Sequence, residues 1–343
     1  MAGKKQTKTV RVGIIGSGPF IEFVGRCWQN LQCAQIVALC DADKARVELS
    51  AQKLGVSSTY ADFQEMIEKA GADAIEIHSP PNLHYQIVKC ACEHAKHVAI
   101  HKPLALSMED AQSIAVAVKN AGITAMMIDP LLFHPFVRRA KSEIDKASIG
   151  EVQSVRIKSH VAGSGGLGPV FDSAQFKNPD FHPLLAPPFD KIALAEYLCG
   201  PIEQVFGYSG NYSSMVTFKF EAAGRYGIHE AIFSPDLYIQ SDAAPVDHSV
   251  EITGTDGIIW IRNLTAAMIE TPKFMLKRKS EVTIWDDRVE YNFENLLTSV
   301  RSHFVKCITG EEKPFHTIAQ GERALAVNMA TQKAIKEGRA IRI

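Results

Sequence analysis

The chain lacks the features that would place it in several classes of protein. Its 343 residues hold 37 basic and 38 acidic side chains, so no excess of one sign favours binding to nucleic acid or to an anionic membrane. No apolar run reaches membrane-spanning length, and the first ten residues carry lysines without the apolar core of a signal peptide. The seven cysteines have no CxxC spacing. We therefore expect a disordered tail over residues 1–10, reduced thiols and a cytoplasmic location.

What is present begins with an apolar strand that runs into a glycine turn. Residues 11–15 are followed by Gly16 and Gly18, and a helical pattern starts after Phe20. The first glycine permits a tight turn, and the second lets the backbone approach a pyrophosphate that the start of the helix attracts. This pattern assigns Gly16, Gly18, Pro19 and Phe20 to cofactor binding.

An acidic residue follows the second predicted strand. Residues 35–40 are apolar and end at Asp41, which lies 23 residues after Gly18. A carboxylate at this position can accept hydrogen bonds from the adenosine ribose hydroxyls and would repel a 2′-phosphate. The first arginine after Asp41 is Arg46. We therefore expect NAD(H) to be preferred over NADP(H).

The rest of the first half alternates strands with helices. Strands are predicted over 73–78, 97–100 and 123–128, with helices over 84–95 and from a capping box at Ser107 to Gly122. This alternation predicts a doubly wound, parallel α/β sheet. Ligands of such sheets bind beside the carboxyl ends of strands. The loop after strand 73–78 therefore supplies further cofactor contacts, namely Ser79, Pro81, Asn82 and His84.

From residue 152 the pattern changes to alternating strands typical of an antiparallel sheet with one apolar face. The predicted strands are 152–162, 203–210, 213–220, 224–233, 248–253, 257–262, 265–270, 273–279 and 281–285. Residues 163–190 predict a long Gly- and Pro-rich loop, of the kind that is usually functional. Helices are predicted over 136–146, 191–199, 292–309 and 318–337.

These motifs together resemble the glucose–fructose oxidoreductase/inositol dehydrogenase (Gfo/Idh/MocA) family over nearly the whole chain. The matching pieces are residues 13–18, Asp41, residues 81–84, Lys102-Pro103, residues 149–152 and residues 321–324 through 338–339. The resemblance implies a Rossmann NAD(P)-binding domain over 11–130, a connecting helix over 131–150, and an α+β domain over 151–316 with a large, mostly antiparallel open sheet. Residues 317–343 would add a helix and a strand. In the family such a sheet commonly forms a homodimer or homotetramer.

Lys102 is the leading candidate for a catalytic residue. A lysine at the carboxyl end of a strand and beside Pro103 can be desolvated, which lowers its pKa and lets it donate to a carbonyl or alkoxide oxygen. In the family the lysine of a Glu-Lys-Pro motif has this role. Here His101 replaces the glutamate. A solvated surface lysine is the simpler alternative.

The second catalytic signature of the family, Asp-x-x-x-His, is broken. Counting back from Gly200 places its two positions at Ala186 and Asp190. Asp190 could act as a general base, or it could only cap the helix that follows. His182 and Lys191 are spare candidates from the same segment, His182 for proton transfer and Lys191 for substrate contact.

Leu132 and His134 are assigned to the substrate pocket, together with His101. Where relatives often carry Asn and Arg, this chain has Pro130 and Leu132, followed by His134, which suggests a less polar pocket. A metal site is not predicted, because the candidate histidines lack the short spacing of metal motifs. Those histidines are His84, His101, His134 and His182.

The sequence thus favours an NAD(H)-dependent oxidoreductase that acts on a small cyclic alcohol or ketone, such as a sugar, a polyol or an aromatic-derived ring. The broken motifs keep open a lyase, hydrolase or decarboxylase on the same scaffold, using NAD transiently or a histidine-bound metal. A third possibility is a non-catalytic relative that only binds its ligand.

Overall fold

The computed structural model describes residues 9–18, 20–164, 189–239, 246–264, 272–285 and 293–343. The chain divides into two compact units. The first comprises residues 1–130 and 294–325, and the second comprises residues 131–293 and 326–343. Among the described residues, no helix is both long and apolar enough to cross a membrane.

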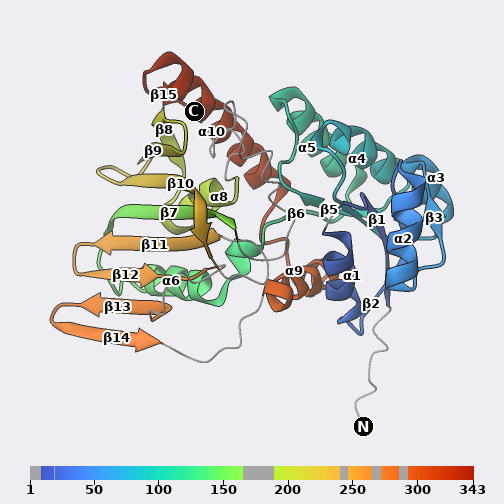
Figure 1. Ribbon diagram of the computed structural model, residues 1–343, viewed down its shortest axis with the longest axis horizontal. Helices are drawn as coiled ribbons and strands as arrows, with labels where there is room; N and C mark the ends of the chain where they lie inside the picture. Colours follow the sequence, from blue (N-terminus) through green and yellow to red (C-terminus); the bar gives the residue numbers. More distant parts are fainter. Residues whose placement is uncertain (1–8, 19, 165–188, 240–245, 265–271, 286–292) are drawn as a thin grey trace, which may run out of the picture. The chain divides into compact units, whose positions relative to one another are not determined.

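The first unit contains a six-stranded parallel sheet with the order β3-β2-β1-β4-β5-β6 (Figure 1). The order reverses between β1 and β4, which is the point where such sheets bind nucleotides. Its strands are β1 (Val10–Ile15), β2 (Ala34–Cys40), β3 (Thr59–Tyr60), β4 (Ala74–Ile77), β5 (His97–His101) and β6 (Ala125–Ile128). Its helices are α1 (Ile21–Gln29), α2 (Lys44–Leu54), α3 (Phe63–Lys69), α4 (His84–Glu93), α5 (Met108–Ala121) and most of α9 (Phe293–Ile308).

Local signals in the sequence account for several of these boundaries. Ser107 accepts a hydrogen bond from the backbone N–H of Asp110 at the start of α5, and Gly122 ends the helix at φ 64°. Thr317 and Gln320 form a capping box at the start of α10 (Ile318–Glu337). The predicted parallel α/β domain is therefore confirmed, and β3 is a strand that the sequence pattern did not reveal.

The second unit contains a nine-stranded sheet with the order β14-β13-β12-β11-β7-β10-β9-β8-β15. Every neighbouring pair is antiparallel except β7 and β10, so the predicted open, mostly antiparallel sheet is confirmed. The strands are β7 (Val152–Ser164), β8 (Ile202–Ser209), β9 (Ser213–Phe220), β10 (Tyr226–Tyr238), β11 (Val246–Gly254), β12 (Gly257–Ile261), β13 (Phe274–Arg278), β14 (Glu281–Trp285) and β15 (Ile341–Arg342).

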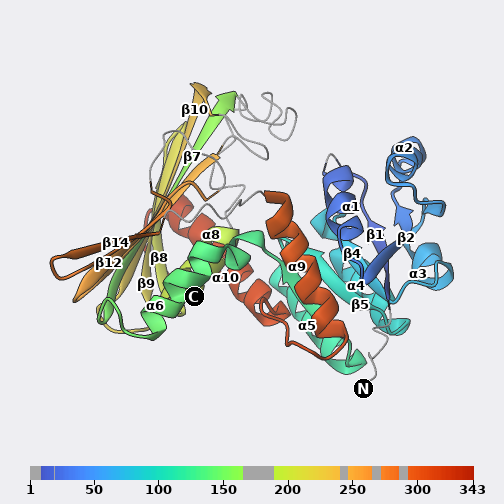
Figure 2. The ribbon, with the colours of Figure 1, turned by 90° about the horizontal axis from the view of Figure 1, so that it is seen from below.

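Helices α6 (Pro135–Asp145) and α8 (Phe189–Cys199) lie along one face of this sheet (Figure 2). In β9 the buried side chains alternate with more exposed ones, and the buried set consists of Ser214, Val216, Phe218 and Phe220. Two short 3₁₀ turns, η1 (Pro81–Leu83) and η2 (Pro130–Phe133), complete the described elements. The predicted strand over 265–270 and most of the long loop lie outside the described residues.

Candidate active site

The glycine turn brings the ends of β1 and β4 into close contact. Gly16 has a φ of 104°, and its N–H donates to the carbonyl of Cys40 at 2.8 Å. A Cβ at position 16 would lie 2.6 Å from the carbonyl carbon of His78, so only glycine fits here. A Cβ at Gly18 would meet no atom within 4 Å. The turn is therefore tight at Gly16 and open at Gly18.

The surroundings of this turn fit the pyrophosphate of a dinucleotide. The hydroxyls of Ser17 and Ser79 are buried and have no hydrogen-bond partner among the described residues. Helix α1 begins just beyond, after the exposed Phe20, and its first N–H groups provide the usual anion site of this fold. Pro19 lies outside the described residues.

Asp41 follows β2 and is almost completely buried. Its carboxylate accepts hydrogen bonds from the backbone N–H groups of Ser17, at 2.6 Å, and Asp43, at 2.9 Å. Arg46 also reaches it, with Nη2 2.6 Å from Oδ1. Burial opposes ionisation of Asp41, but the hydrogen bonds from Arg46 and the two N–H groups hold its pKa below the usual value. Arg46, the first arginine after Asp41 in the sequence, therefore contacts the carboxylate that the sequence assigns to the adenosine ribose.

The loop after β4 is fixed by His84. This side chain is buried, with Nδ1 3.1 Å from the carbonyl oxygen of Leu104 and Nε2 3.0 Å from that of Ser79. Burial lowers the pKa of His84. It therefore joins the loop to the segment after β5, while Pro81 and Asn82 form η1 on the more exposed side.

Lys102 directly follows the last residue of β5. His101 is half-buried, and its Nδ1–H donates to the carbonyl of Lys102 at 3.0 Å. Burial, with the nearby His78 and Lys102, lowers the pKa of His101 to about 3 and keeps the imidazole neutral. Asp129 and His316 are also buried, and His316 interacts electrostatically with both Asp129 and Lys102. Burial lowers the pKa of His316 as well.

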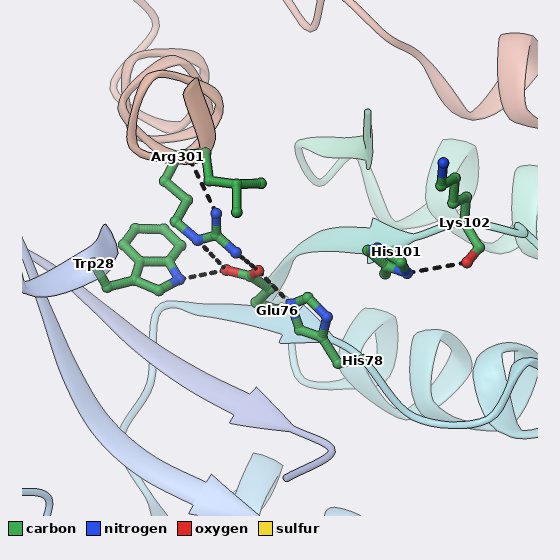
Figure 3. A network of polar contacts seen from close by, with 7 residues as sticks. Trp28, Glu76, His78, His101, Lys102 and Arg301 are labelled. Carbon is green, nitrogen blue, oxygen red and sulfur yellow. Dashed lines mark hydrogen bonds and ion pairs between the residues drawn. The ribbon is translucent and has the colours of Figure 1, made fainter. Parts of the chain in front are cut away.

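A buried charge network lies next to His101 and was missed in the sequence (Figure 3). Glu76, in the middle of β4, is fully buried and accepts hydrogen bonds from Trp28 Nε1 and from Nε and Nη2 of Arg301 on α9. His78 Nε2 lies 2.5 Å from Glu76 Oε1. Burial favours the neutral acid, but Arg301 and His78 outweigh it and lower the pKa of Glu76 to about 2. The one available signal was a glutamate inside an apolar strand, since a buried charge needs a partner.

Of the predicted residues in the second unit, Asp190 and Lys191 lie together. Asp190 is in the first turn of α8, and its Oδ2 accepts from Lys191 Nζ at 2.7 Å. His229 on β10, also missed in the sequence, is buried and 3.1 Å from the hydroxyl of Ser159. Burial, helped by Lys191, lowers the pKa of His229 to about 3.

The remaining candidates of the second unit are buried or not described. Leu132 and His134 are buried, and His134 Nδ1 accepts from the N–H of Phe136 at 3.2 Å. Burial lowers the pKa of His134 to about 3. His182 lies outside the described residues. In the described part of the chain, no group of three or more His, Cys, Asp or Glu side chains is arranged to hold a metal ion.

Comparison with known proteins places this geometry among the oxidoreductases. Residues 10–128 match the family model of the Gfo/Idh/MocA oxidoreductases, described as an oxidoreductase family with an NAD-binding Rossmann fold. Myo-inositol 2-dehydrogenase of Thermotoga maritima is 24% identical, over 97% of this chain and 98% of its own. The NADP-dependent D-xylose 1-dehydrogenase 2 of Haloferax volcanii is 30% identical, over 35% of this chain and 37% of its own.

A solved structure extends the likeness over the whole fold. Scyllo-inositol dehydrogenase from Lactobacillus casei, solved with NAD(H) and scyllo-inositol, superposes with a TM-score of 0.79 at 20% identity, over 98% of this chain and 99% of that one. At this level of identity the likeness establishes the fold. The match of residues 10–128 relates the Rossmann domain to the Gfo/Idh/MocA oxidoreductases, and the dehydrogenase relative is similar to this chain over nearly its whole length.

Proposed function

We propose that this protein is an NAD(H)-dependent dehydrogenase that transfers hydride between the nicotinamide and a carbon of a small cyclic alcohol or ketone. The proposal rests on one observation, which is that three features lie together at one edge of the parallel sheet. These features are the turn at Gly16, the carboxylate of Asp41 and the strand end before Lys102. Each of them lies at the carboxyl end of a strand. The strands concerned lie on either side of the point where the strand order reverses. A nucleotide and a reacting oxygen can be held at this edge.

Each group has a separate task in the proposed reaction. Gly16, Gly18 and the hydroxyls of Ser17 and Ser79 would hold the pyrophosphate, and Asp41 the adenosine ribose. Bound NAD supplies the hydride chemistry. Lys102 would bind the substrate oxygen and stabilise the negative charge that develops there. Asp190, Lys191 and His182 remain predictions for substrate contact or proton transfer.

The substrate class follows from the relatives and from the sequence. Relatives over the full chain act on inositols, which are cyclic polyols, and this supports a sugar or polyol as substrate. The apolar residues at 131–133 would also suit an aromatic-derived ring. The relatives are dehydrogenases, so they lend no support to a lyase, hydrolase or decarboxylase.

We further propose that NAD(H) is preferred over NADP(H). The carboxylate of Asp41 sits where the ribose hydroxyls bind and would repel a 2′-phosphate. Arg46 works against this preference, because its guanidinium neutralises part of the carboxylate charge and could itself contact a phosphate. The preference should therefore be moderate.

The experiment that tests the dehydrogenase function is a Lys102→Met exchange, with Lys119→Met on the exposed surface of α5 as the matched control. Wild type and both variants are assayed by NADH absorbance against a panel of cyclic polyols, sugars and aromatic glycosides, and NADH binding is measured by fluorescence. We expect Lys102→Met to bind NADH normally and to lose turnover by about 10²–10⁴-fold, as for loss of an acid–base group. Turnover equal to wild type in Lys102→Met would rule out this assignment.

We also propose that a second copy of the chain pairs with the open face of the nine-stranded sheet. The strand register aligns one row of side chains across the sheet, and nearly all of them are less buried than the neighbouring residues of their own strands, so the row belongs to the open face. The row consists of Phe206, Thr217, Ile228, Arg156, Glu251, Trp260, Met275 and Ile284. Apolar side chains predominate in it, and a broad apolar patch of this kind marks an interaction surface.

An Ile228→Glu exchange tests this pairing, with Val116→Glu on α5 as the control for an exposed apolar residue. We expect light scattering to give an oligomer for wild type and Val116→Glu and a monomer for Ile228→Glu, because a charge in the middle of the interface would be buried without a partner. An unchanged oligomer in Ile228→Glu would contradict the proposal.

A further inference from the structure

His78 has one ring nitrogen committed and the other available. Its Nε2 is 2.5 Å from Glu76 Oε1. In the described part of the chain nothing bonds to its Nδ1, which lies on the far side of the ring from Glu76 (Figure 3). The side chain is 15% exposed, whereas Glu76 is fully buried. The structure therefore holds an imidazole by its buried edge and leaves its other nitrogen at the surface of the site.

The partner of Nε2 selects the tautomer. Glu76 is held ionised by Arg301 and can only accept hydrogen bonds, so Nε2 of His78 must carry a proton and donate it. A neutral His78 then has its lone pair on Nδ1. A carboxylate that orients an imidazole in this way also stabilises the imidazolium that forms when the free nitrogen takes a proton.

His78 lies beside the strand end that precedes Lys102. The parallel register of β4 and β5 pairs Ile77 with Ile100, so the next positions along are His78 and His101. Their ring centroids are 5.1 Å apart, and His101 precedes Lys102. The backbone of His78 also forms the wall against which Gly16 packs. His78 thus stands between the cofactor turn and the lysine.

The charged and titratable groups around His78 come from four elements. They are Glu76 on its own strand, Arg301 on α9, His101 and Lys102 at the end of β5, and His84 on α4. Glu76 stays ionised and His101 stays neutral across the range in which dehydrogenases are assayed, since their pKa values are lowered to about 2 and about 3. These two neighbours therefore contribute no limb to a pH profile in that range.

Resting on the dehydrogenase function proposed above, we infer that His78 is the proton acceptor for the substrate hydroxyl, with Nε2–H held by Glu76 and Nδ1 presented to the substrate. This imidazole would replace the one that the family signature places at the position of Asp190. When an alcohol is oxidised, the O–H bond breaks and its proton passes to Nδ1. Bound NAD would supply the acceptor for the hydride, so that the C–H bond at the same carbon would break with its electron pair and the carbon would become a carbonyl. The imidazolium of His78 then releases the proton to water.

The test is a His78→Gln exchange, with His94→Gln at the exposed end of α4 as the matched control. The amide of glutamine can still donate to Glu76, so the buried network is kept while the base is removed. The assay is the pH profile of kcat and kcat/KM for the alcohol of the panel that the wild type oxidises fastest. We expect His78→Gln to lower kcat by about 10²–10⁴-fold and to remove the acidic limb of the profile. His94→Gln should match the wild type.

Two readouts do not depend on turnover. NADH fluorescence titration should give the same affinity for wild type and His78→Gln. Nitrogen-15 NMR of histidine-labelled protein, with the His78 signals assigned by their loss in the variant, should identify the Nε2–H tautomer. An unchanged kcat and pH profile, a weakened NADH affinity that accounts for the lost rate, or an Nδ1–H tautomer would each overturn the role of His78. A wild type that oxidises no alcohol would instead overturn the proposed function, and this inference with it.

Discussion

Removal of Arg301 is the sharpest test of the buried network in the first unit. An Arg301→Met exchange leaves the carboxylate of Glu76 buried beside Trp28 without its cation. Loss of one member of a buried ion pair destabilises a protein by about 3–5 kcal/mol. The lowered pKa of Glu76 agrees in sign, because Arg301 makes the largest contribution among the groups that favour the ionised carboxylate. We therefore expect a loss of about 3 kcal/mol in the free energy of unfolding.

The assay is urea unfolding followed by tryptophan fluorescence, to which Trp28 beside Glu76 contributes, and by circular dichroism. Arg11→Met, which breaks an exposed pair with Asp73, is the control and should change stability little. A double variant, Glu76→Gln with Arg301→Met, replaces the carboxylate by a neutral amide that can still accept from Trp28. It should be more stable than Arg301→Met alone. If the double variant is no more stable than that single one, the two charges are not coupled and the reasoning fails.

The same pair sets a dependence on pH. The folded-state pKa of Glu76 is depressed, so its contribution is complete above the unfolded value of 4.5 and is lost as the pH falls from there towards 2. Wild type should therefore lose stability over this window. Glu76→Gln with Arg301→Met should lose less over the same window, and equal losses would contradict the depressed pKa.

Two further predictions concern the cofactor site. Gly16→Ala places a Cβ against the backbone of His78 at a φ of 104°. We expect this variant to bind NADH about tenfold or more weakly in a fluorescence titration. We also expect thermal unfolding to show that the first unit is destabilised by about 1–3 kcal/mol. Normal binding would show that the turn can relax. Arg46→Ala removes the cation at Asp41, so the affinity for NADPH should fall about tenfold while the affinity for NADH changes less. Asp41→Ala removes the carboxylate instead and should shift the cofactor preference towards NADPH. A rise in NADPH affinity in Arg46→Ala would refute the role of Arg46.

Much of the first unit could be predicted because its signals are local. The strand before Gly16 and the caps at Ser107 and Thr317 each depend on residues within one or two turns of one another. The second sheet was predicted as alternating strands with boundaries off by up to a few residues. Its strand order and the parallel pair of β7 and β10 did not follow from the sequence, because pairing joins segments far apart in the chain.

The candidate site divides in the same way. Gly16, Asp41 and Lys102 were found because each stands at a recognisable place beside a strand end. Glu76, by contrast, was seen only as one polar residue in an apolar strand. Its partner Arg301 lies 225 positions away and is not recognisable as a partner from its own neighbourhood.

The amino-acid pattern alone thus specified the class of each domain, the glycine turn and the lysine at the strand end, because periodicity, capping and backbone freedom operate over a few residues. Tertiary packing decided which charges meet. It set Arg46 on Asp41, Arg301 on Glu76, and His78 beside His101. The reason is that a buried charge is stabilised by whichever partner the fold brings within hydrogen-bonding distance, however remote that partner is in the chain.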